Sequence, residues 1–367
     1  MCGPLRVEDI LKKNYSAIAV LALTALAVSA CGAGNDQKAS ANKSASEQKA
    51  DKSVTLIAYD SFPTKDIKPA FEKKTGYKLK VVDGGDGAEL TNKLVVSKGA
   101  PVADVALGMD NNVALTAADK DVFEKTDVKL PKGADKYQVK GQDALVPFDR
   151  SQYCLNLDQK WFKDKGKAEP TSFEDLTKPE YKNLVVVEDP RKSTPGMGLL
   201  TATIADRGEN AFADYWKKLK DNGVEVTGGW TDAFAKFSTS EGGTKPVMAG
   251  YASSPAYPTG KDDAGKDVFN MKNVDSTCYA AVEYMSALKG AKNTEGAKVL
   301  MDYLLSKDAQ ELVSKVNYMY PVNSQAQLPK DLAEHGAEVK DALNIDPKKV
   351  ADNRTAWLKT WADAMGM

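Results

Sequence analysis

The chain has 367 residues and is almost neutral, with 50 lysines and arginines against 51 aspartates and glutamates. This balance excludes a protein that binds nucleic acid through a basic surface, and it excludes attachment to a membrane by charge alone. The single histidine, His335, lies in a polar segment apart from any Cys/His cluster. We therefore expect no metal site and no cofactor.

Residues 1–30 have the pattern of an export signal. Two lysines precede an apolar run at residues 17–28, which is short for a membrane span. The Val-Ser-Ala that precedes Cys31 resembles the lipobox of bacterial lipoproteins, in which the cysteine is lipidated; plain secretion is the alternative. We expect a lipid anchor at Cys31 on the outer face of the cytoplasmic membrane, within the periplasm if an outer membrane is present.

Residues 31–52 are expected to be a disordered tether, because from Gly32 onward they contain no large apolar side chain. The roughly 315 residues that follow are more than one hydrophobic core usually serves, so we predict two lobes.

The folded part begins with a strand, a helix and a second strand. Residues 54–58 are a β-branched apolar run, Ile67 and Phe71 have helical spacing before Gly76, and residues 78–82 again resemble a strand. This order predicts a parallel pair joined by a crossover helix, and therefore an α/β protein.

A capping box predicts the next helix. Asp86 has the N-cap position and Glu89 the N3 position, and Leu90 and Leu94 follow on one helix face. Residues 103–108 then predict a third buried strand that ends in polar residues. Ligands meet open α/β sheets at such strand ends.

A second α/β unit follows. Residues 184–187 are a continuous apolar strand. Ser193 or Thr194 as N-cap, with Pro195 behind it, predicts a helix whose free N–H groups would suit an anion or a polar ligand edge. Further on, Trp230 stands alone in a predicted loop.

Tyr251 and Tyr257 follow a short apolar strand at residues 245–249. Pro255 divides the two rings, which do not fit one face of a helix or strand. We predict that they lie on a loop beside a ligand; a turn whose tyrosines cap the core is the alternative.

Cys154 and Cys278 remain once Cys2 is lost with the signal and Cys31 is lipidated. In an oxidising compartment we favour a structural disulfide between them, with two buried thiols as the alternative.

The chemistry points to binding rather than catalysis. The sequence has no phosphate loop, no nucleophile elbow and no metal-ligand spacing, so we expect no catalytic residues and no enzyme. Most carboxylates at predicted strand ends, such as Asp60 and Asp149, are expected to cap the chain or stay solvated. Aromatic residues on loops among acids suit a flat, cationic or aromatic ligand. These features are typical of an exported solute receptor.

A series of short blocks resembles the thiamine-binding receptors of bacterial ABC importers, which have the type II periplasmic-binding-protein fold. The blocks run in order over most of the chain after the tether: Tyr59-Asp60-Ser61-Phe62, Asp86-Gly87, Ala103-Asp104-Val105, Asp110-Asn111-Asn112, Pro147-Phe148-Asp149, Asp189-Pro190-Arg191, Ser193-Thr194-Pro195-Gly196, Gly229-Trp230, Ser254-Pro255-Ala256-Tyr257 and Met319-Tyr320-Pro321-Val322.

The resemblance implies five aromatic residues around the rings of thiamine: Tyr59, Trp230, Tyr251, Tyr257 and Tyr318. It implies that Asp86 and Gly87 meet the polar pyrimidine or thiazolium side, and that Ser193 meets the hydroxyethyl or phosphate end. Tyr318 stands where the family has tryptophan, and Asp66 where a relative has one. The stacking area at Tyr318 is therefore smaller, and the contact at Asp66 is expected to be missing or electrostatic.

The implied fold is α/β with a ligand cleft between two lobes that are joined by hinge strands. The strands of Cys154 and Cys278 fall where those crossings are expected, so a disulfide would staple the hinge. The implied division is a signal peptide at 1–30, a tether at 31–52, the first part of lobe 1 at 53–150, a hinge strand and lobe 2 at 151–277, and a return hinge strand, the rest of lobe 1 and the C-terminal helices at 278–367.

The resemblance also implies a monomeric receptor that delivers thiamine, with its mono- and diphosphate as further ligands, to an ABC permease and its ATPase. One alternative is a thiaminase-like enzyme of the same fold with Cys154 as nucleophile, which a disulfide would exclude. Another is a ferric-ion receptor, whose paired tyrosines are adjacent, whereas Tyr251 and Tyr257 are not. The last is a purely structural lipoprotein.

Overall fold

The computed structural model describes residues 52–367. The predicted signal peptide, Cys31 and the tether up to residue 51 lie outside the described residues. Within 52–367, no helix is both long and apolar enough to cross a membrane.

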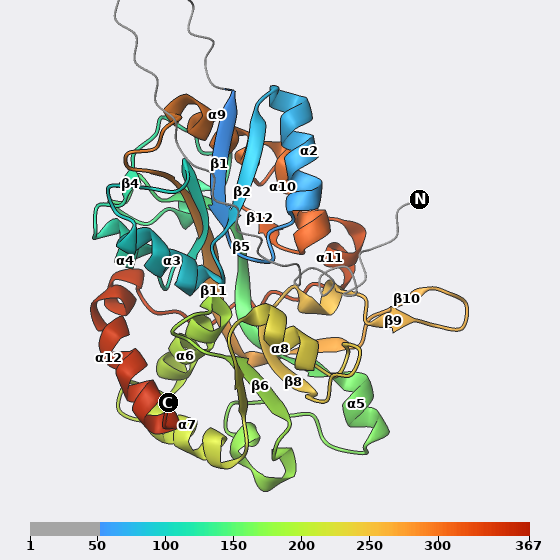
Figure 1. The fold of residues 1–367 in the computed structure, drawn as a ribbon. Helices are drawn as coiled ribbons and strands as arrows, with labels where there is room; N and C mark the ends of the chain where they lie inside the picture. The colour runs from blue at the N-terminus through green and yellow to red at the C-terminus, as the bar shows by residue number, and fades with distance from the viewer. Residues whose placement is uncertain (1–51) are drawn as a thin grey trace, which may run out of the picture. The chain divides into compact units, whose positions relative to one another are not determined.

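One mixed sheet organises the described chain, in the order β2-β1-β3-β11-β5-β8-β6-β7 (Figure 1). The pair β1–β2 is parallel, as predicted, and so is β1–β3. The predicted α/β class is therefore confirmed. The strands are β1 (Ser53–Ala58), β2 (Lys78–Asp83), β3 (Val105–Asp110), β4 (Phe123–Glu124), β5 (Val146–Asp158), β6 (Val185–Glu188), β7 (Glu225–Thr227), β8 (Val247–Tyr251), β9 (Gly260–Lys261), β10 (Asp267–Val268), β11 (Met271–Leu288) and β12 (Tyr320–Pro321).

Helices cover this sheet, and the two starts that the sequence predicts, at Asp86 and at Ser193, are confirmed. They are α2 (Thr64–Thr75), α3 (Gly87–Val96), α4 (Ala114–Ala118), α5 (Gln159–Asp164), α6 (Thr194–Arg207), α7 (Phe212–Asp221), α8 (Trp230–Lys236), α9 (Thr294–Leu305), α10 (Lys307–Asn317), α11 (Lys330–His335) and α12 (Pro347–Met365). We call β1–β3 with α2, α3, α9 and α10 the first lobe, and β6–β8 with α6–α8 the second lobe.

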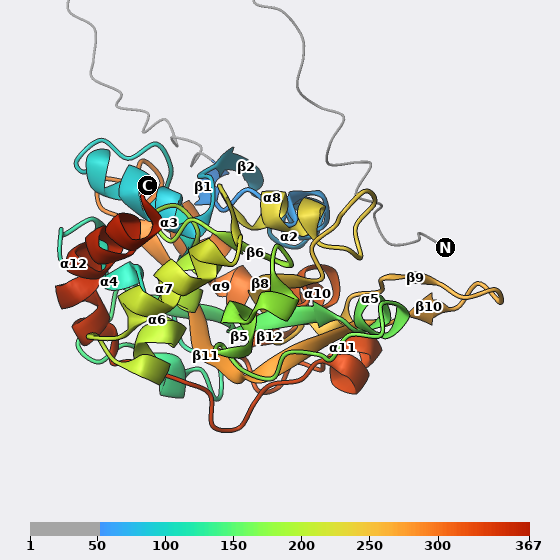
Figure 2. The same ribbon diagram turned by 90° about the horizontal axis from the view of Figure 1, so that it is seen from below.

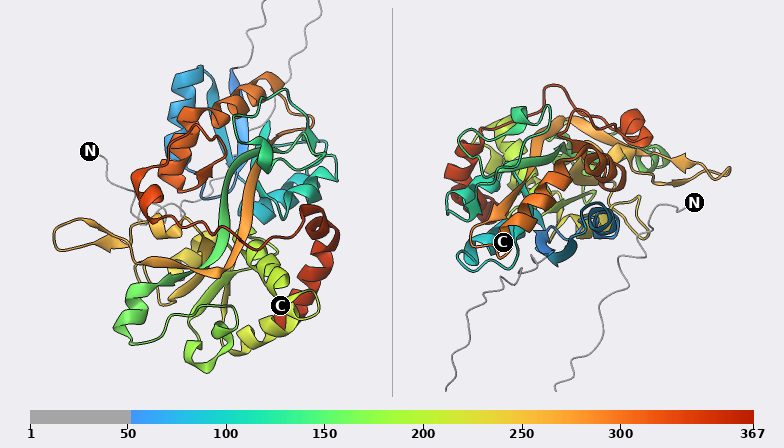
Figure 3. Two further views of the ribbon diagram at one scale, coloured as in Figure 1. Left: turned by 180° about the vertical axis from the view of Figure 1, so that it is seen from behind. Right: turned by 90° about the horizontal axis from the view of Figure 1, so that it is seen from above.

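The strands β5 and β11 run side by side through the middle of the sheet and serve both lobes (Figure 3). The residues near the start of β5 pair with the part of β11 that also borders β3, whereas the residues near its end pair with β8. Cys154 on β5 and Cys278 on β11 are joined by a disulfide. The covalent link therefore connects the two strands that pass between the lobes.

Two apolar clusters hold the layers together. The cluster under α2, α9 and α10 packs on one face of β1 and β3, with Phe71 and Leu300 fully buried. The other cluster lies beneath α3, α6, α7 and α12, where Trp216 meets Trp361 edge-to-face at a ring-centroid distance of 5.9 Å. The large apolar residues of α7 recur at helical spacing and are buried in this cluster: Phe212, Tyr215, Trp216 and Leu219. Figure 2 shows α12 beside α7, which it contacts.

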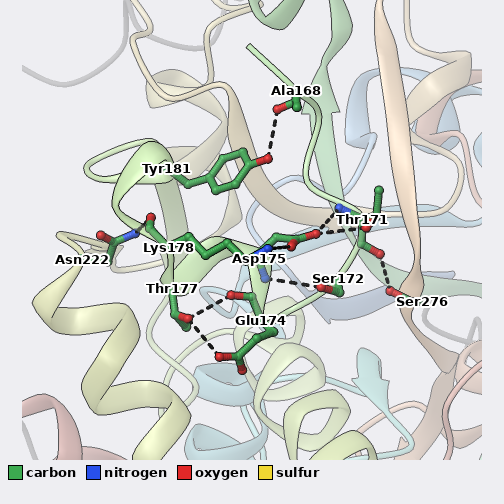
Figure 4. A network of polar contacts seen from close by, with 10 residues as sticks. All are labelled: Ala168, Thr171, Ser172, Glu174, Asp175, Thr177, Lys178, Tyr181, Asn222 and Ser276. Carbon is green, nitrogen blue, oxygen red and sulfur yellow. Dashed lines mark hydrogen bonds and ion pairs between the residues drawn. The ribbon is translucent and has the colours of Figure 1, made fainter.

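A polar network fixes the connection between α5 and β6 (Figure 4). The Asp175 carboxylate accepts hydrogen bonds from the backbone N–H and the hydroxyl of Thr171, at 2.8 and 3.0 Å, and pairs with Lys178. These contacts hold the pKa of Asp175 well below its usual range, the Lys178 hydrogen bond having the largest effect. Ser276 on β11 donates to the carbonyl of Thr171, so the connection is tied to a long central strand.

Two local predictions are wrong. Trp230 does not lie in a loop but is the first residue of α8. Asp86 is the N-cap of α3, yet the capping box does not form, because the backbone N–H of Glu89 donates to the carbonyl of Lys192 instead. In both cases a contact with a distant segment replaces the local arrangement that the sequence favours.

Candidate functional site

A narrow cavity lies between the two lobes, lined from both sides. Its lining residues are Tyr59, Asp60, Ser61, Asp86, Gly87, Gly108, Thr194, Trp230, Tyr251 and Glu283. Five of the eight residues predicted to bind ligand are among them: Tyr59, Asp86, Gly87, Trp230 and Tyr251. The cavity volume is about 20 Å³, room for roughly one water molecule. A ligand with aromatic rings can enter only if the lobes separate.

Asp86 connects the lobes at this cavity. Its Oδ1 accepts hydrogen bonds from the backbone N–H of Gly87, at 2.6 Å, and from the backbone N–H of Thr194, at 2.9 Å. Its Oδ2 accepts from the backbone N–H of Trp230 at 3.2 Å. Thr194 and Trp230 are the first residues of α6 and α8, so one carboxylate of the first lobe lies at the positive ends of two helices of the second.

The ionisation of Asp86 reflects this position. Burial raises the pKa of its carboxyl, while hydrogen bonds from Thr194 and Trp230 oppose that shift. The predicted anion-binding role of the α6 N-terminus is thus taken, in this structure, by a carboxylate of the chain itself.

Two glycines permit the close approach of the lobes. A Cβ atom on Gly87 would lie 2.4 Å from the carbonyl oxygen of Gly108 and 2.6 Å from the Thr194 side chain. Gly108 has a φ of 109°, and a Cβ there would lie 2.4 Å from the ring of Tyr59. The absence of side chains lets the Tyr59 ring and the start of α3 lie directly against β3.

Aromatic rings form the other walls. The Trp230 ring stacks on Phe234 with centroids 5.0 Å apart and tilts toward Tyr251 at 6.5 Å. Across the cavity, the Tyr59 hydroxyl accepts a hydrogen bond of 2.8 Å from the side chain of Asn317. The Trp230 indole N–H is buried without a hydrogen-bond partner, so it is a donor that a ligand could use.

The other three predicted residues do not line this cavity. Tyr257 and Tyr318 contact each other edge-to-face at 5.5 Å, and Tyr257 also meets Phe234, which lies behind Trp230. Ser193 is fully buried, and its hydroxyl accepts from the backbone N–H of Gly196 as the N-cap of α6. These three residues lie close to residues that line the cavity but do not line it themselves.

Sequence reasoning did not assign Asp60, Ser61, Gly108, Thr194 and Glu283 to the site. Asp60 and Ser61 directly follow Tyr59, and Thr194 directly follows Ser193. The predicted site residues beside them could therefore have indicated these three. Glu283 had a different signal, a charged residue directly after the apolar run of the predicted return strand that begins at Cys278. The Thr231 hydroxyl donates to Asp60 at 3.4 Å, a further hydrogen bond between the lobes.

Buried acids lie beneath the cavity. Burial raises the pKa values of Glu283 and Asp149 well above the usual carboxyl range, and the mutual repulsion of the two groups raises that of Glu283 further. Asp149 thus departs from the expectation for strand-end carboxylates, since it is 1% exposed and neither oxygen has a hydrogen-bond partner. Burial also raises the pKa of Tyr251 well above its usual value.

A larger cavity of about 180 Å³ lies elsewhere, between the end of α3 and the end of β11. Leu94, Pro101, Val122 and Leu288 line it, together with lysine and backbone atoms. It contains none of the predicted site residues and no cluster of aromatic rings, so its size does not make it the better candidate.

Comparison with known proteins identifies the family of this chain and structures that share its fold. Residues 100–342 match the model of the family described as bacterial extracellular solute-binding protein. The chain belongs to this family. The thiamine-binding periplasmic protein of Salmonella typhimurium is 33% identical over 322 residues, which cover 85% of this chain and 93% of that protein.

Solved structures of other proteins share the fold. A structure described as a periplasmic thiamin binding protein has a TM-score of 0.74 and 30% identity, covering 85% of this chain and 96% of that one. A ferric binding protein from Campylobacter jejuni has a TM-score of 0.67 at 18% identity and covers 85% and 99% of the two chains, a likeness of fold alone. The predicted two-lobed fold of periplasmic binding proteins is confirmed.

Proposed function

We propose that this protein is an extracytoplasmic receptor that captures thiamine between its two lobes and delivers it to an ABC importer. The observation that carries the proposal is the cavity where Tyr59, Trp230 and Tyr251 meet the carboxylates of Asp86 and Glu283. Thiamine has a permanently cationic ring and a flat pyrimidine, and aromatic faces beside carboxylates suit both. The name of the Salmonella typhimurium relative supports the same ligand.

The proposal extends to how the ligand is held. Asp86 and Gly87 would meet the polar edge of a ring, and Trp230 and Tyr251 would stack on its faces. Thiamine mono- and diphosphate are further candidate ligands, since the α6 N-terminus next to Ser193 suits a phosphate once the lobes part. Tyr257 and Tyr318 would support the Trp230 side of the cleft from behind.

We further propose that the protein works as a monomer, held at the membrane by a lipid on Cys31, with a permease and its ATPase as partners. The division into lobes at residues 53–150, 151–277 and 278–367 is part of this proposal. The path of β5 and β11 supports it, because β11 pairs with β3 of the first lobe, β5 pairs with β8 of the second, and the two strands pair with each other.

The enzyme alternative finds less support. A thiaminase-like reaction needs a free thiolate in the cleft, but Cys154 is bonded to Cys278 and packs with Ala252 rather than against the cavity. The proposal is therefore a receptor that releases its ligand unchanged.

The test follows the intrinsic fluorescence of the protein while thiamine is added and then identifies the bound molecule after denaturation. We expect saturable quenching through Trp230 and recovery of intact thiamine. Recovery of the separated pyrimidine and thiazole would favour the enzyme instead, and unchanged fluorescence together with no thiamine in the denatured sample would reject thiamine as the ligand.

A further inference from the structure

Three carboxylates lie side by side across the centre of the sheet. Glu283 on β11 is the register partner of Asp110 on β3 and of Asp149 on β5. Directly opposite residues of neighbouring antiparallel strands project on the same face, and like charges there repel. The exposed fractions of Asp110, Glu283 and Asp149 are 0%, 5% and 1%, so water screens this repulsion little.

The three carboxylates differ in their hydrogen-bond partners. Asp110 is satisfied, because its carboxylate accepts from the Tyr153 hydroxyl at 2.9 Å and from the side chain of Asn112 at 2.8 Å. Asp149 has no hydrogen-bond partner on either oxygen, and Oε2 of Glu283 has none either. Within residues 52–367 no ion pair involves Glu283 or Asp149.

Glu283 is the member of this row that reaches the ligand cleft. It lines the cavity together with Tyr59, Trp230 and Tyr251, whereas Asp110 and Asp149 do not. A buried carboxylate without a partner is costly to a protein and is usually explained by what it binds. An acid directed into an aromatic cavity without a counter-charge of its own fits a ligand that brings a positive charge.

We propose that Glu283 is the carboxylate that pairs with the positive ring of the ligand, and that it makes the receptor select permanently cationic heterocycles over uncharged ones of the same shape. This inference rests on the proposed function, since it assigns the charge of that ligand to one side chain. Glu283 then gives selectivity for charge, while the rings of Trp230 and Tyr251 give affinity for any flat ligand.

A proton accompanies this pairing. Burial, followed by repulsion from Asp149, Asp110 and Asp86, raises the pKa of Glu283 well above its usual value. A cation bound beside Glu283 would lower that pKa again, so binding favours the passage of a proton from Glu283 to the solvent. The titratable groups that interact with it electrostatically are Asp149 and Tyr153 from β5, Asp110 from β3, Asp86 from the start of α3, Tyr59 after β1 and Tyr251 from β8. Two arginines, Arg150 from β5 and Arg354 from α12, act on its neighbours Asp149 and Asp110.

The arginines do not neutralise Glu283 in this arrangement. Arg150 acts on Asp149 and pairs with Glu338, and Arg354 acts on Asp110. Asp86, which also repels Glu283, is held by backbone N–H groups of the second lobe. A bound cationic ligand would therefore supply the positive charge that no described side chain places beside Glu283.

The experiment titrates the protein calorimetrically with thiamine and with an uncharged analogue in which carbon replaces the ring nitrogen that carries the charge. Each titration is repeated in phosphate and in Tris at pH 7.5, because the difference in heat counts the protons released. We expect the wild-type protein to bind thiamine about ten- to a hundredfold more tightly than the analogue, with protons released only by thiamine.

Glu283→Gln keeps the shape of the side chain and removes its charge. We expect it to lose most of this preference and the proton release, while its affinity for the analogue stays within about twofold. Glu188→Gln is the matched control, since Glu188 is also fully buried with both oxygens unpartnered but does not line the cavity. It should retain both the preference and the proton release.

The outcomes separate the two proposals. If the wild-type protein binds thiamine but binds the analogue equally well, or if Glu283→Gln weakens both ligands alike, Glu283 does not select charge and only this inference fails. If the wild-type protein binds neither compound, the proposed function fails as well. If Glu283→Gln does not fold, Glu283→Ala takes its place with the same expected loss of preference, and equal binding of the two ligands by the wild-type protein rejects the inference without either variant.

Discussion

The carboxylate of Asp86 accepts a 2.9 Å hydrogen bond from the backbone N–H of Thr194, across the boundary between the two lobes. The same carboxylate accepts from Trp230, so the chain places one of its own anions at two helix N-termini. Charge-assisted bonds of this kind hold the lobes together at the cavity. A ligand that enters the cleft has to open or rearrange this contact.

Asp86→Ala should shift the free protein toward an open form and weaken thiamine binding. Affinity should fall because the ligand loses the carboxylate that would meet the polar edge of its ring; a charge-assisted hydrogen bond contributes about 1.5–3 kcal/mol, so a fall of about ten- to a hundredfold is expected. Small-angle X-ray scattering of the free protein should show a larger radius of gyration. Glu89→Ala is the matched control, because Glu89 lies on the same helix and pairs only with Lys93. Equal scattering and affinity for wild type and Asp86→Ala would contradict the bridging role.

Trp230→Ala removes the ring that faces Tyr251 and should lower thiamine affinity by about ten- to a hundredfold, as for other stacked rings. The α8 helix should survive, since alanine is a good helix former and the backbone N–H of residue 230 is retained. Trp161→Ala on α5, which removes a tryptophan away from the cavity, should leave affinity unchanged. Binding that is insensitive to Trp230→Ala would place the ligand elsewhere.

Reducing the Cys154–Cys278 disulfide should lower the melting temperature while leaving thiamine affinity within about twofold. The bond closes a loop with a sequence separation of 124, and its loss is expected to cost about 2–4 kcal/mol. Affinity should persist because neither sulfur lines the cavity. The check is thermal unfolding with and without reductant, repeated with the double substitution of both cysteines by serine. Identical melting curves would contradict a stapled hinge.

Asp110 makes stability depend on pH in a defined direction. Burial raises its pKa from 3.8 to about 6, against the hydrogen bonds from Asn112 and Tyr153. An acid whose pKa is raised on folding adds stability that is present below about pH 4 and is lost as the pH rises through about 6. Relative to Asp110→Asn, the wild-type protein should therefore lose free energy of unfolding between pH 4 and 7.

Denaturant unfolding at a series of pH values measures this difference directly. Asp119→Asn serves as the control, because Asp119 is an exposed acid at the end of the next helix and should follow the wild-type curve. A difference between wild type and Asp110→Asn that does not change from pH 4 to 7 would show that Asp110 does not titrate in this range.

Much of the fold could be predicted because each element carries its own pattern. The apolar run at residues 54–58, the N-cap Ser193 and the left-handed Gly76 after α2 are local signals, and each lies where expected. The long strands were predicted only in part. The apolar run around Cys154, residues 153–157, forms only the second half of β5, because the start of the strand contains Pro147 and two charged residues that interrupt the apolar pattern.

The site was harder to predict, because it depends on register and on contacts between distant segments. Glu283 meets Asp149 only through the antiparallel pairing of β11 with β5, which the sequence does not specify. Trp230 looked like a loop residue since two glycines precede it, yet they let α8 start where its N–H meets Asp86. Tyr318 ends α10 in a left-handed conformation, with a φ of 55°, and so turns toward Tyr257 instead of the cavity.

The central claim is that this cleft binds thiamine, and the most direct measurement is a calorimetric titration of the protein, disulfide intact, with thiamine at neutral pH. The account predicts a saturable isotherm with one thiamine per chain and no heat after saturation. An absence of heat at every temperature tried, or heat that continues to flow after each injection as the ligand is consumed, would contradict it.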